Sequence, residues 1–418
     1  MANDNSEQRN VVIVGGGIIG CTSAYYITHH PSYSPETTKV TILEATSIAG
    51  GASGKAGGLV AKWAYPKELV DITFAEHERL AKEHGGAERW GWRYTNCGQW
   101  EGKGEDTPVA GSAAMTSKVS LNKKDGLHTS ETVQASAHKR RRKKRVLPEG
   151  LDWVKEDLTE SYEPMSGEGE TAQVHPYEFT TSMCALAQEK GAKLVLGKVT
   201  AITNVDLSTG SKQSRAVSAV SYIDKETGNP ATIPATHVIV SAGPWTSTVL
   251  PNVPISGMRG HSITVRPTRP VSAYCLFTEI TMPDGRGATP EIYARPNNEV
   301  YACSPGDSLP LPASTAEVQV DNTVCDALFK QVAAISPELR GGEVTVRQAC
   351  YLPSLNSGPS GCPIVGEDEN VKGLIIAAGH TCWGICNAPG TARAVSELVM
   401  DGKITCGNLS RLAPRNFI

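Results

Sequence analysis

A short glycine-rich segment near the N-terminus has the residue types and spacing of a phosphate-binding turn. A β-branched run at 11–14 leads directly into Gly15-Gly16-Gly17-Ile18-Ile19-Gly20, which satisfies the pattern G-x-G-x-x-G. Gly15 permits a tight turn, Gly17 lacks the Cβ that would block a pyrophosphate, and Gly20 lets a helix pack closely on the strand. That helix, expected from Cys21 to about His29, would offer N–H groups and partial positive charge to the phosphates.

An acidic residue follows where such a site binds a ribose. A second strand at 39–43 ends in Glu44-Ala45, and the carboxylate can accept hydrogen bonds from ribose hydroxyls. Strand, turn, helix and carboxylate together predict a dinucleotide site. A strand–turn–helix unit without a ligand is the alternative, because glycine turns are common.

A second glycine loop comes next, Gly50-Gly51-Ala52-Ser53-Gly54-Lys55-Ala56-Gly57-Gly58. Backbone with so few side chains can approach a flat ring system and its phosphates closely. The loop resembles that of the D-amino-acid oxidase superfamily, which includes glycine oxidase and sarcosine oxidase. In that family a G-A-S-x-x-x-G-G loop wraps the flavin, and the matching residues here are Ser53, Ala56, Gly57 and Gly58. The resemblance implies FAD as the cofactor.

Three later segments extend the resemblance over most of the chain. The strand at 191–199 is similar to the family strand whose backbone meets the adenine, here at Val199. An apolar strand at 236–241 ends in the family's A-G-x-W turn, Ala242-Gly243-Pro244-Trp245. The segment 374–384 resembles a C-terminal strand, turn and helix, whose helix N-terminus stabilises negative charge on the reduced flavin. Its implied flavin contacts are Gly379, His380, Trp383 and Gly384.

The predicted fold class is α/β, with a Rossmann-like FAD-binding domain and a second substrate domain based on an antiparallel β-sheet. By the resemblance, the FAD-binding domain is discontinuous and comprises residues 1–62, 150–245 and 345–418. The substrate domain comprises residues 63–100 and 246–344. The stretch 101–149 is poor in large apolar residues, so we expect a mobile insertion there.

The family oxidises C–N bonds by hydride transfer to the flavin. Members of the glycine-oxidase type carry an arginine that clamps the substrate carboxylate, and Leu352 occupies its place here. Without a fork of N–H donors at that point, bidentate carboxylate binding is lost, so the sequence does not fit a simple α-amino acid substrate there. Other cations could substitute for the arginine: Lys55, Lys62, Arg259 and Arg347.

Three residues are candidates for substrate binding. Arg259 lies in an R-G turn that leads into the substrate sheet. Tyr293 begins a predicted hairpin at 293–301 whose first tyrosine faces the substrate in the family, with an ordinary half-buried strand tyrosine as the alternative. Tyr351 is the third, beside Leu352 on the same predicted strand.

Two further residues could take part in the flavin chemistry. Lys55 is the catalytic candidate, because an ammonium in the flavin loop could polarise the ring or activate oxygen; a solvated lysine is the alternative. Cys350 lies near the position where sarcosine oxidases attach their flavin through a thioether. A free cysteine of the core is the alternative there.

Composition excludes several other classes of protein. A charged fraction of 20% and a net charge of −3 give no global basic field for nucleic-acid binding, and a small-molecule substrate is expected instead. No window approaches the roughly 18 unbroken apolar residues of a membrane span, and the polar start does not suggest a signal peptide. The 11 cysteines lack metal-ligand spacing, so we expect reduced thiols, a cytoplasmic protein and no metal site. The basic run Lys139–Arg145 fits a solvated loop or a nuclear-import signal.

The leading hypothesis is an FAD-dependent oxidoreductase that oxidises the C–N bond of an amine or an amino-acid-like small molecule. An FAD-binding scaffold or regulatory protein with weak or no activity is the alternative, and both Leu352 and the basic insertion favour it. An NAD(P)-linked reductase is disfavoured because no second G-x-G-x-x-G appears downstream.

Overall fold

The computed structural model describes residues 8–106, 146–207, 214–356 and 362–418. The predicted insertion at 101–149 falls mostly outside these residues, and the basic run Lys139–Arg145 falls entirely outside them. Within the part described, the chain forms two large β-sheets and one small one. None of its described helices is both long enough and apolar enough to cross a membrane.

The first large sheet has a parallel centre. Its order is β10-β9-β8-β2-β1-β11-β20-β18, with β19 paired to β9, and the five central strands from β8 to β20 run parallel. The strands are β1 (Arg9–Val14), β2 (Thr38–Glu44), β8 (Lys193–Asp206), β9 (Arg215–Asp224), β10 (Pro230–Pro234), β11 (His237–Val240), β18 (Ile364–Glu367), β19 (Val371–Lys372) and β20 (Leu374–Ala378).

Strand β1 is buried on both faces, as its continuous β-branched run predicts. Val11 and Ile13 join a core with the helices, whereas Val12 and Val14 join a core with β9 on the opposite side. On the helical side α1 packs against α5 and α9, and α3 packs on α9. These helices are α1 (Ile18–Thr28), α3 (Lys67–His84), α5 (Pro176–Glu189) and α9 (Gly384–Asp401).

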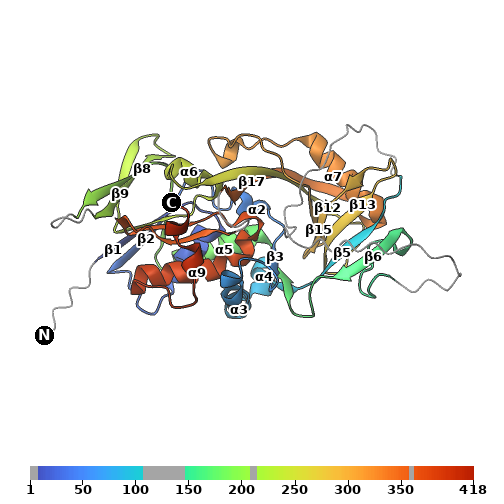
Figure 1. Ribbon diagram of the computed structural model, residues 1–418, viewed down its shortest axis with the longest axis horizontal. Coiled ribbons are helices and arrows are strands. Elements are labelled where there is room, and N and C mark those ends of the chain that lie inside the picture. The colour runs from blue at the N-terminus through green and yellow to red at the C-terminus, as the bar shows by residue number, and fades with distance from the viewer. Residues whose placement is uncertain (1–7, 107–145, 208–213, 357–361) are drawn as a thin grey trace.

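The second large sheet has the order β17-β12-β16-β15-β13-β5-β6, with β14 paired to β13. Its neighbouring strands pair antiparallel except for β5 and β13, which run parallel. The strands are β5 (Asn96–Lys103), β6 (Thr159–Pro164), β12 (Ile255–Arg266), β13 (Tyr274–Thr281), β14 (Gly287–Ala288), β15 (Glu291–Arg295), β16 (Glu299–Cys303) and β17 (Glu343–Leu355). The two large sheets lie toward opposite ends of an elongated molecule (Figure 1).

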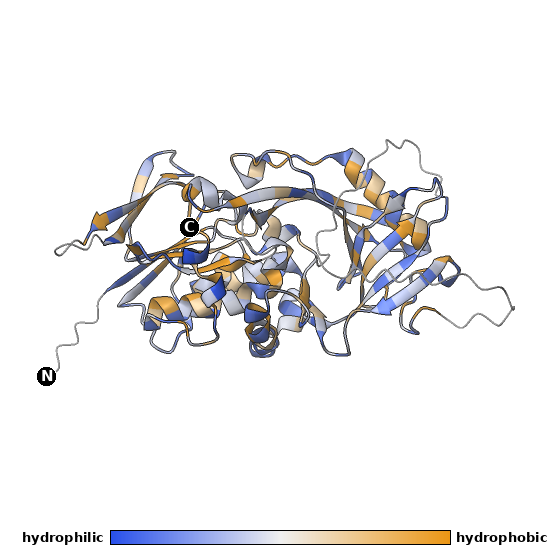
Figure 2. Ribbon diagram, in the orientation of Figure 1, coloured by the Kyte–Doolittle hydropathy of each residue, from blue (hydrophilic) through white to orange (hydrophobic). Residues whose placement is uncertain are grey.

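Helix α7 (Asn322–Ile335) covers one face of this second sheet. Its residues Leu328, Val332 and Ile335 are buried with Ile263 and Leu276 of the strands. Apolar and polar stretches alternate along the helix (Figure 2), which is the pattern of a helix with one buried stripe. The predicted α/β class with a Rossmann-like part and a largely antiparallel second sheet is therefore confirmed.

Shorter elements complete the chain. A three-stranded sheet has the order β3-β7-β4, with β3 (Leu59–Ala61), β7 (Thr171–Gln173) and β4 (Arg93–Tyr94). The short α-helices are α2 (Ala52–Lys55), α4 (Gly86–Trp90), α6 (Thr246–Val249) and α8 (Pro337–Arg340). The 3-10 helices are η1 (Glu156–Leu158), η2 (Gly243–Trp245), η3 (Thr315–Glu317), η4 (Thr381–Trp383), η5 (Ser410–Leu412) and η6 (Pro414–Asn416).

The predicted hairpin at 293–301 is present as β15 and β16, with Tyr293 directly opposite Tyr301. Its turn residues Asn297 and Asn298 have φ of 63° and 56°. Asparagine tolerates this left-handed backbone better than most residues, so the Pro-Asn-Asn sequence correctly predicts the turn.

Two strands cross the predicted domain boundaries. Strand β6 lies within the stretch 150–245 assigned to the FAD-binding domain, yet it pairs with β5 of the second sheet. Strand β17 lies mostly after residue 345, yet it pairs with β12 over its whole length. The partner of a strand is determined by contacts with residues distant in sequence. A domain boundary placed from the sequence alone does not take these contacts into account. The domain division itself stays a prediction.

Candidate functional site: a dinucleotide cavity between the two sheets

The glycine turn after β1 has the geometry that its sequence predicts. Gly15 has a φ of 107°, and a Cβ added there would lie 2.6 Å from the carbonyl oxygen of Ser241. Helix α1 begins at Ile18, with Gly17 as its N-cap and no side-chain cap. N–H groups in the first turn of a helix have no intrahelical acceptor, so those that no side chain accepts are available to phosphate oxygens. A Cβ on Gly20 would lie 2.0 Å from the carbonyl oxygen of Gly15, which confirms close packing of helix on turn.

Glu44 lies at the end of β2, beside this turn. Its carboxylate accepts hydrogen bonds from the N–H of Gly16 and the N–H of Thr46, both at 2.7 Å. Oε1 also accepts the hydroxyl of Thr46 at 3.0 Å, whereas Oε2 has a second lone pair that can bind a ribose hydroxyl without breaking these contacts. Glu44 and Ala45 both line the cavity described below, which is compatible with their predicted role at the adenosine.

The second glycine loop lies over the first. The Oγ of Ser53 accepts the N–H of Ile18 at 2.9 Å, so the two glycine segments are tied together at the start of α1. At the other end of the loop, the guanidinium of Arg295 donates to the carbonyl oxygens of Ala56 and Gly57. A Cβ on Gly57 would come within 2.1 Å of the Tyr293 ring, so only glycine fits between loop and ring.

One elongated cavity collects most of the predicted cofactor contacts, and its empty space amounts to ≈ 1840 Å³ when its open mouth is included. The cavity runs from the glycine turn after β1 to Tyr293 and Tyr301 of the second sheet, as a site for a dinucleotide requires. The predicted residues that line it are Gly15, Gly17, Ile18, Ile19, Glu44, Ala45, Ser53, Ala56, Gly57, Gly58, Val199, Ala242, Gly243, Trp245, Gly379, His380, Trp383, Gly384 and Tyr293. Gly20 does not line the cavity, in keeping with its packing role.

The C-terminal turn before α9 forms the far end of the cavity. Gly379 has a φ of 90°, and Thr381 has a φ of 50°, a left-handed conformation that is uncommon for threonine. His380 is buried, and burial lowers its pKa to about 3, so its imidazole is neutral at physiological pH. Its Nε2 lies 2.9 Å from the Oγ1 of Thr391. The turn therefore presents backbone and a neutral ring to the cavity.

Three predicted functional residues do not reach the cavity. The ammonium of Lys55 donates to the carbonyl oxygen of Ala349 at 3.0 Å. The hydroxyl of Tyr351 donates to the carbonyl oxygen of Pro310 at 2.8 Å. Arg259 pairs with Asp307, with a nitrogen–oxygen distance of 2.7 Å. Their positions therefore do not support the predicted role of Lys55 in the flavin chemistry or the predicted roles of Arg259 and Tyr351 at the substrate.

The alternation of residues along a strand explains the positions of Arg259 and Tyr351. Arg259 on β12 is directly opposite Tyr351 on β17, and the next pair along is Gly260 opposite Cys350. Alternate residues of a strand face opposite sides of the sheet. Gly260, Cys350 and Leu352 line the cavity, so Arg259 and Tyr351 face away from it.

The other two candidate replacement cations are also engaged elsewhere. Arg347 pairs with Asp326, with a nitrogen–oxygen distance of 2.9 Å. The ammonium of Lys62 lies 4.8 Å from the centroid of the Phe74 ring. Leu352 itself lines the cavity, so the place of the family arginine is occupied by an apolar side chain.

Cys350 lies on the cavity as a buried thiol. Burial raises its pKa to about 11, and the nearby Lys55 lowers it only in part. Because the thiolate is the reactive form of cysteine, this environment disfavours attack by the sulfur at neutral pH. The thioether remains a prediction.

Sequence reasoning missed Glu291, which lines the cavity from β15 and is 3% exposed. It also missed Arg295, whose position on the same strand lets it hold the glycine loop. Both lie two residues from Tyr293, on the same face of the strand. Because residues two apart on a strand face the same side, the prediction that Tyr293 faces the cavity could also have identified Glu291 and Arg295.

Comparisons with known proteins agree with this geometry. A family model described as FAD dependent oxidoreductase matches residues 10–398. The "Putative oxidoreductase TDA3" of Saccharomyces cerevisiae is 34% identical, with 99% of this chain and 96% of that protein covered. The "Putative oxidoreductase C1F5.03c" of Schizosaccharomyces pombe is 33% identical, with 99% and 100% covered. Among solved structures, glycine oxidase from Bacillus cereus has a TM-score of 0.64 at 19% identity, with 95% and 96% covered.

The glycine turn at Gly15–Gly20, the Glu44 carboxylate and the second glycine loop fit FAD. The family match assigns the same cofactor. The match includes both large sheets and the whole of the cavity between them. This chain belongs to the FAD-dependent oxidoreductase family.

Proposed function

We propose that this protein oxidises the C–N bond of an amine or an amino-acid-like small molecule. One observation carries the proposal: the cavity continues beyond its nucleotide-binding turn to Glu291, Tyr293 and Tyr301 of the second sheet. A protein that kept FAD only as a structural element would need no space there. Bound FAD supplies the hydride acceptor, and the protein supplies binding and orientation.

The residues of the chain divide into two groups in this proposal. The turn at Gly15–Gly20 and the start of α1 hold the phosphates, and Glu44 holds the ribose. The loop at Ala56 and Gly57, which Arg295 holds through its carbonyl oxygens, would contact the bound cofactor. The substrate would occupy the remaining space beside Tyr293.

The electrostatics of the far end favour a ring that becomes negative when reduced. His380 is neutral, so it does not supply a positive charge. Helix α9 has no acidic residue in its first turn and no side-chain cap. Its N-terminal N–H groups and partial positive charge are therefore the groups that stabilise added negative charge.

The direct test is anaerobic reduction of the protein-bound flavin. The purified chain, reconstituted with FAD where necessary, should show a flavin absorption spectrum that bleaches with members of a panel of primary, secondary and N-methylated amines. A matched panel of simple α-amino acids should bleach it more slowly, because Leu352 removes the carboxylate clamp. A protein that cannot be loaded with FAD would overturn the proposal.

The alternative function is a flavoprotein scaffold or regulator. The apolar Leu352 in place of the family arginine is the observation that favours it. Under this alternative the protein binds FAD with the same spectrum, and no amine or amino acid bleaches it. The reduction experiment separates the two functions without knowledge of the natural electron acceptor.

A further inference from the structure

The substrate end of the cavity, defined here as the part lined by β15, β16, β17 and the turn before α9, contains an acidic side chain. Glu291 is 3% exposed and lines the cavity, and it stands directly opposite Cys303 in the hairpin. The Tyr293 hydroxyl donates to its Oε2 at 2.5 Å, and the Cys303 thiol donates to the same oxygen at 3.8 Å. These contacts hold the carboxyl group at the cavity wall.

Basic side chains are missing from this part of the wall among the described residues. The lysine that lines the cavity, Lys198, is on β8 and lies next to Val199 at the adenosine end. His261 and His380 line the cavity, but burial lowers the pKa of both, so their imidazoles are neutral at physiological pH. A substrate carboxylate would therefore meet Glu291 and no cation.

The nearest cation on the hairpin is directed elsewhere. Arg295 is 5% exposed and does not line the cavity. Its guanidinium donates to the glycine loop, pairs with Glu299 at 2.8 Å and lies 4.6 Å from the centroid of the Tyr301 ring. The Arg295 side chain therefore contacts the glycine loop, Glu299 and the Tyr301 ring, and it does not extend into the cavity.

Three aromatic side chains, Tyr293, Tyr301 and Trp383, also line this part of the cavity. Tyr293 and Tyr301 are stacked with centroids 5.8 Å apart, and Phe277 lies 6.1 Å from Tyr293. Trp383 is 2% exposed and lines the cavity, and its Nε1 has no hydrogen-bond partner among the described residues. Aromatic faces attract cations, and an unused buried N–H is a donor for a ligand.

We propose that Glu291 is a specificity-determining residue that selects a cationic amine and makes a substrate carboxylate unnecessary. This inference rests on the proposed function for its biological meaning. An ammonium group binds in the cavity against the wall that Glu291, Tyr293 and Tyr301 form. A carboxylate ligand is rejected there by the like charge of Glu291 and by the apolar Leu352.

The test measures binding of two redox-inert probes to the full FAD-loaded chain. Benzyltrimethylammonium is the cationic probe and benzoate is the anionic one, and each is titrated while the flavin absorption spectrum is followed. The unmodified protein should bind the cation at least tenfold more tightly than benzoate. Glu291→Gln should reduce that ratio at least tenfold.

Glu299→Gln is the matched control. It makes the same chemical change on the same hairpin, but Glu299 pairs with Arg295 and does not line the cavity. It should leave the ratio of the two affinities within about twofold of that of the unmodified protein. Flavin loading and the melting temperature are measured for both variants.

Equal or tighter binding of benzoate by the unmodified protein overturns the inference, even where Glu291→Gln fails to fold. An unchanged ratio in a folded Glu291→Gln protein also overturns it. Because neither probe is oxidised, the result does not depend on catalysis. Cation preference without bleaching by any amine contradicts the proposed function alone, and bleaching without cation preference contradicts this inference alone.

Discussion

Gly57 occupies a position where the backbone of the flavin loop touches the ring of a buried tyrosine. A Cβ there would lie 2.1 Å from two ring carbons of Tyr293, which is fully buried and cannot rotate freely. Gly51 belongs to the same loop, but a Cβ there would meet the nearest atom, Cγ2 of Thr315, at 3.4 Å. The two glycines thus differ in the space beside them and not in the loop they occupy.

At this scale we expect Gly57→Ala to weaken FAD binding by about tenfold to a hundredfold, because overpacking typically costs about 1–3 kcal/mol. The added methyl group displaces either the loop or the Tyr293 ring. Gly287→Ala is the control, because a Cβ there meets no atom within 4 Å and Gly287 does not line the cavity; it should bind FAD within about twofold of the unmodified protein. Fluorescence quenching of FAD on titration with apoprotein gives both constants, and equal affinities in the two variants would refute the steric argument.

Helix α9 is interrupted near its start, and α3 supplies the hydrogen bonds that the interruption removes. Pro389 lies inside α9 and has no N–H to donate to the carbonyl oxygen of Ile385. The Nε2 of His77 donates to that oxygen at 3.1 Å and to the one of Cys386 at 3.0 Å. The hydroxyl of Thr73 also donates to Cys386, and it accepts the N–H of Gly390.

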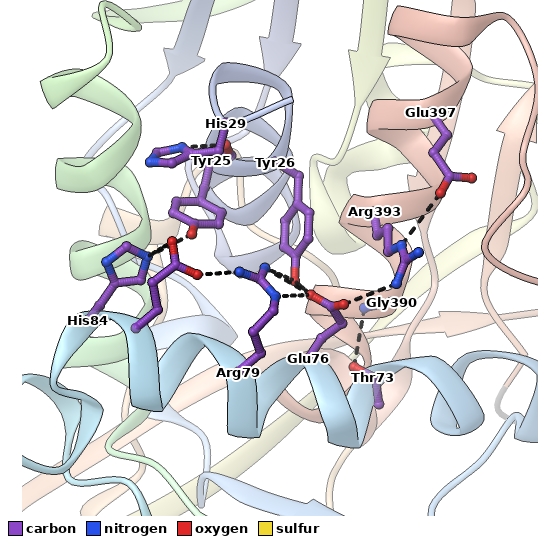
Figure 3. Close-up of polar contacts among 11 residues, drawn as sticks. Tyr25, Tyr26, His29, Thr73, Glu76, Arg79, His84, Gly390, Arg393 and Glu397 are labelled. Atoms are coloured by element: carbon purple, nitrogen blue, oxygen red, sulfur yellow. Dashed lines mark hydrogen bonds and ion pairs between the residues drawn. The ribbon is translucent and has the colours of Figure 1, made fainter. Parts of the chain in front are cut away.

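The same face of α3 also joins α1 to α9 (Figure 3). The carboxylate of Glu76 accepts the hydroxyl of Tyr26 at 2.5 Å and pairs with Arg393 at 3.1 Å. Arg79 approaches the carboxylate from α3 itself, at 2.9 Å. Burial and the neighbouring Glu76 raise the pKa of the Tyr26 phenol, so the proton stays on the tyrosine. Helix α3 therefore fixes the helix whose N-terminus closes the cavity.

His77 makes the contact between α3 and α9 less stable at acid pH. Burial lowers its pKa from 6.5 to about 4, and its Nδ1 has no hydrogen-bond partner among the described residues. The unfolded chain binds a proton near pH 6.5 while the folded one does not. The stability from His77 is therefore complete above pH 6.5 and is lost as pH falls toward 4, by about 3 kcal/mol in total.

We expect His77→Gln to reduce the loss of stability between pH 7 and pH 4.5. Glutamine keeps an N–H donor for the carbonyl oxygens of α9 but does not titrate. Urea unfolding at several pH values, compared between the two proteins, isolates the contribution of His77 from those of the other histidines. Parallel curves of stability against pH would show that His77 does not titrate in this way.

At the scale of the whole molecule, the cavity is shared by both large sheets. Its wall includes Gly15 and Glu44 of the parallel sheet as well as Tyr293 and Cys350 of the second sheet. The core around Ile13 includes Phe277, Tyr293 and Tyr301 of the second sheet, and a further core around Ile263 lies between that sheet and α7. A bound FAD would therefore contact both parts of the molecule at once.

Bound FAD should raise the melting temperature of the whole chain. At a concentration of 100 times Kd, ligand binding adds about 2.7 kcal/mol. For a chain of 418 residues this corresponds to about 3 °C, from the usual entropy of unfolding per residue. Differential scanning calorimetry with FAD, and with ADP as a control that fills only the nucleotide part, measures the shift. ADP at the same concentration should give a smaller shift, because it makes only the nucleotide contacts and binds more weakly. An equal shift at equal concentration would contradict a ligand that contacts both sheets.

The sequence by itself determined the features that depend on residues close together in the chain. The strand, glycine turn and helix at 11–28, the carboxylate at Glu44, the loop at 50–58 and the hairpin at 293–301 could all be predicted. Each of these depends on local backbone freedom or on a short alternation of apolar residues, which the sequence carries directly. The cofactor followed from these features together with the family resemblance.

The tertiary structure decided which side chains face the substrate. Arg259 and Tyr351 are turned away from the cavity by the register of β12 against β17, and Lys55 is held by the backbone of β17. Glu291 enters the cavity because β15 pairs with β16 and lies beneath the glycine loop. One step of strand register exchanges the two faces of a strand, and that register is set by contacts distant in sequence. The sequence therefore predicts the cofactor, while the pairing of the strands places Glu291 on the cavity wall and turns Arg259 away from it.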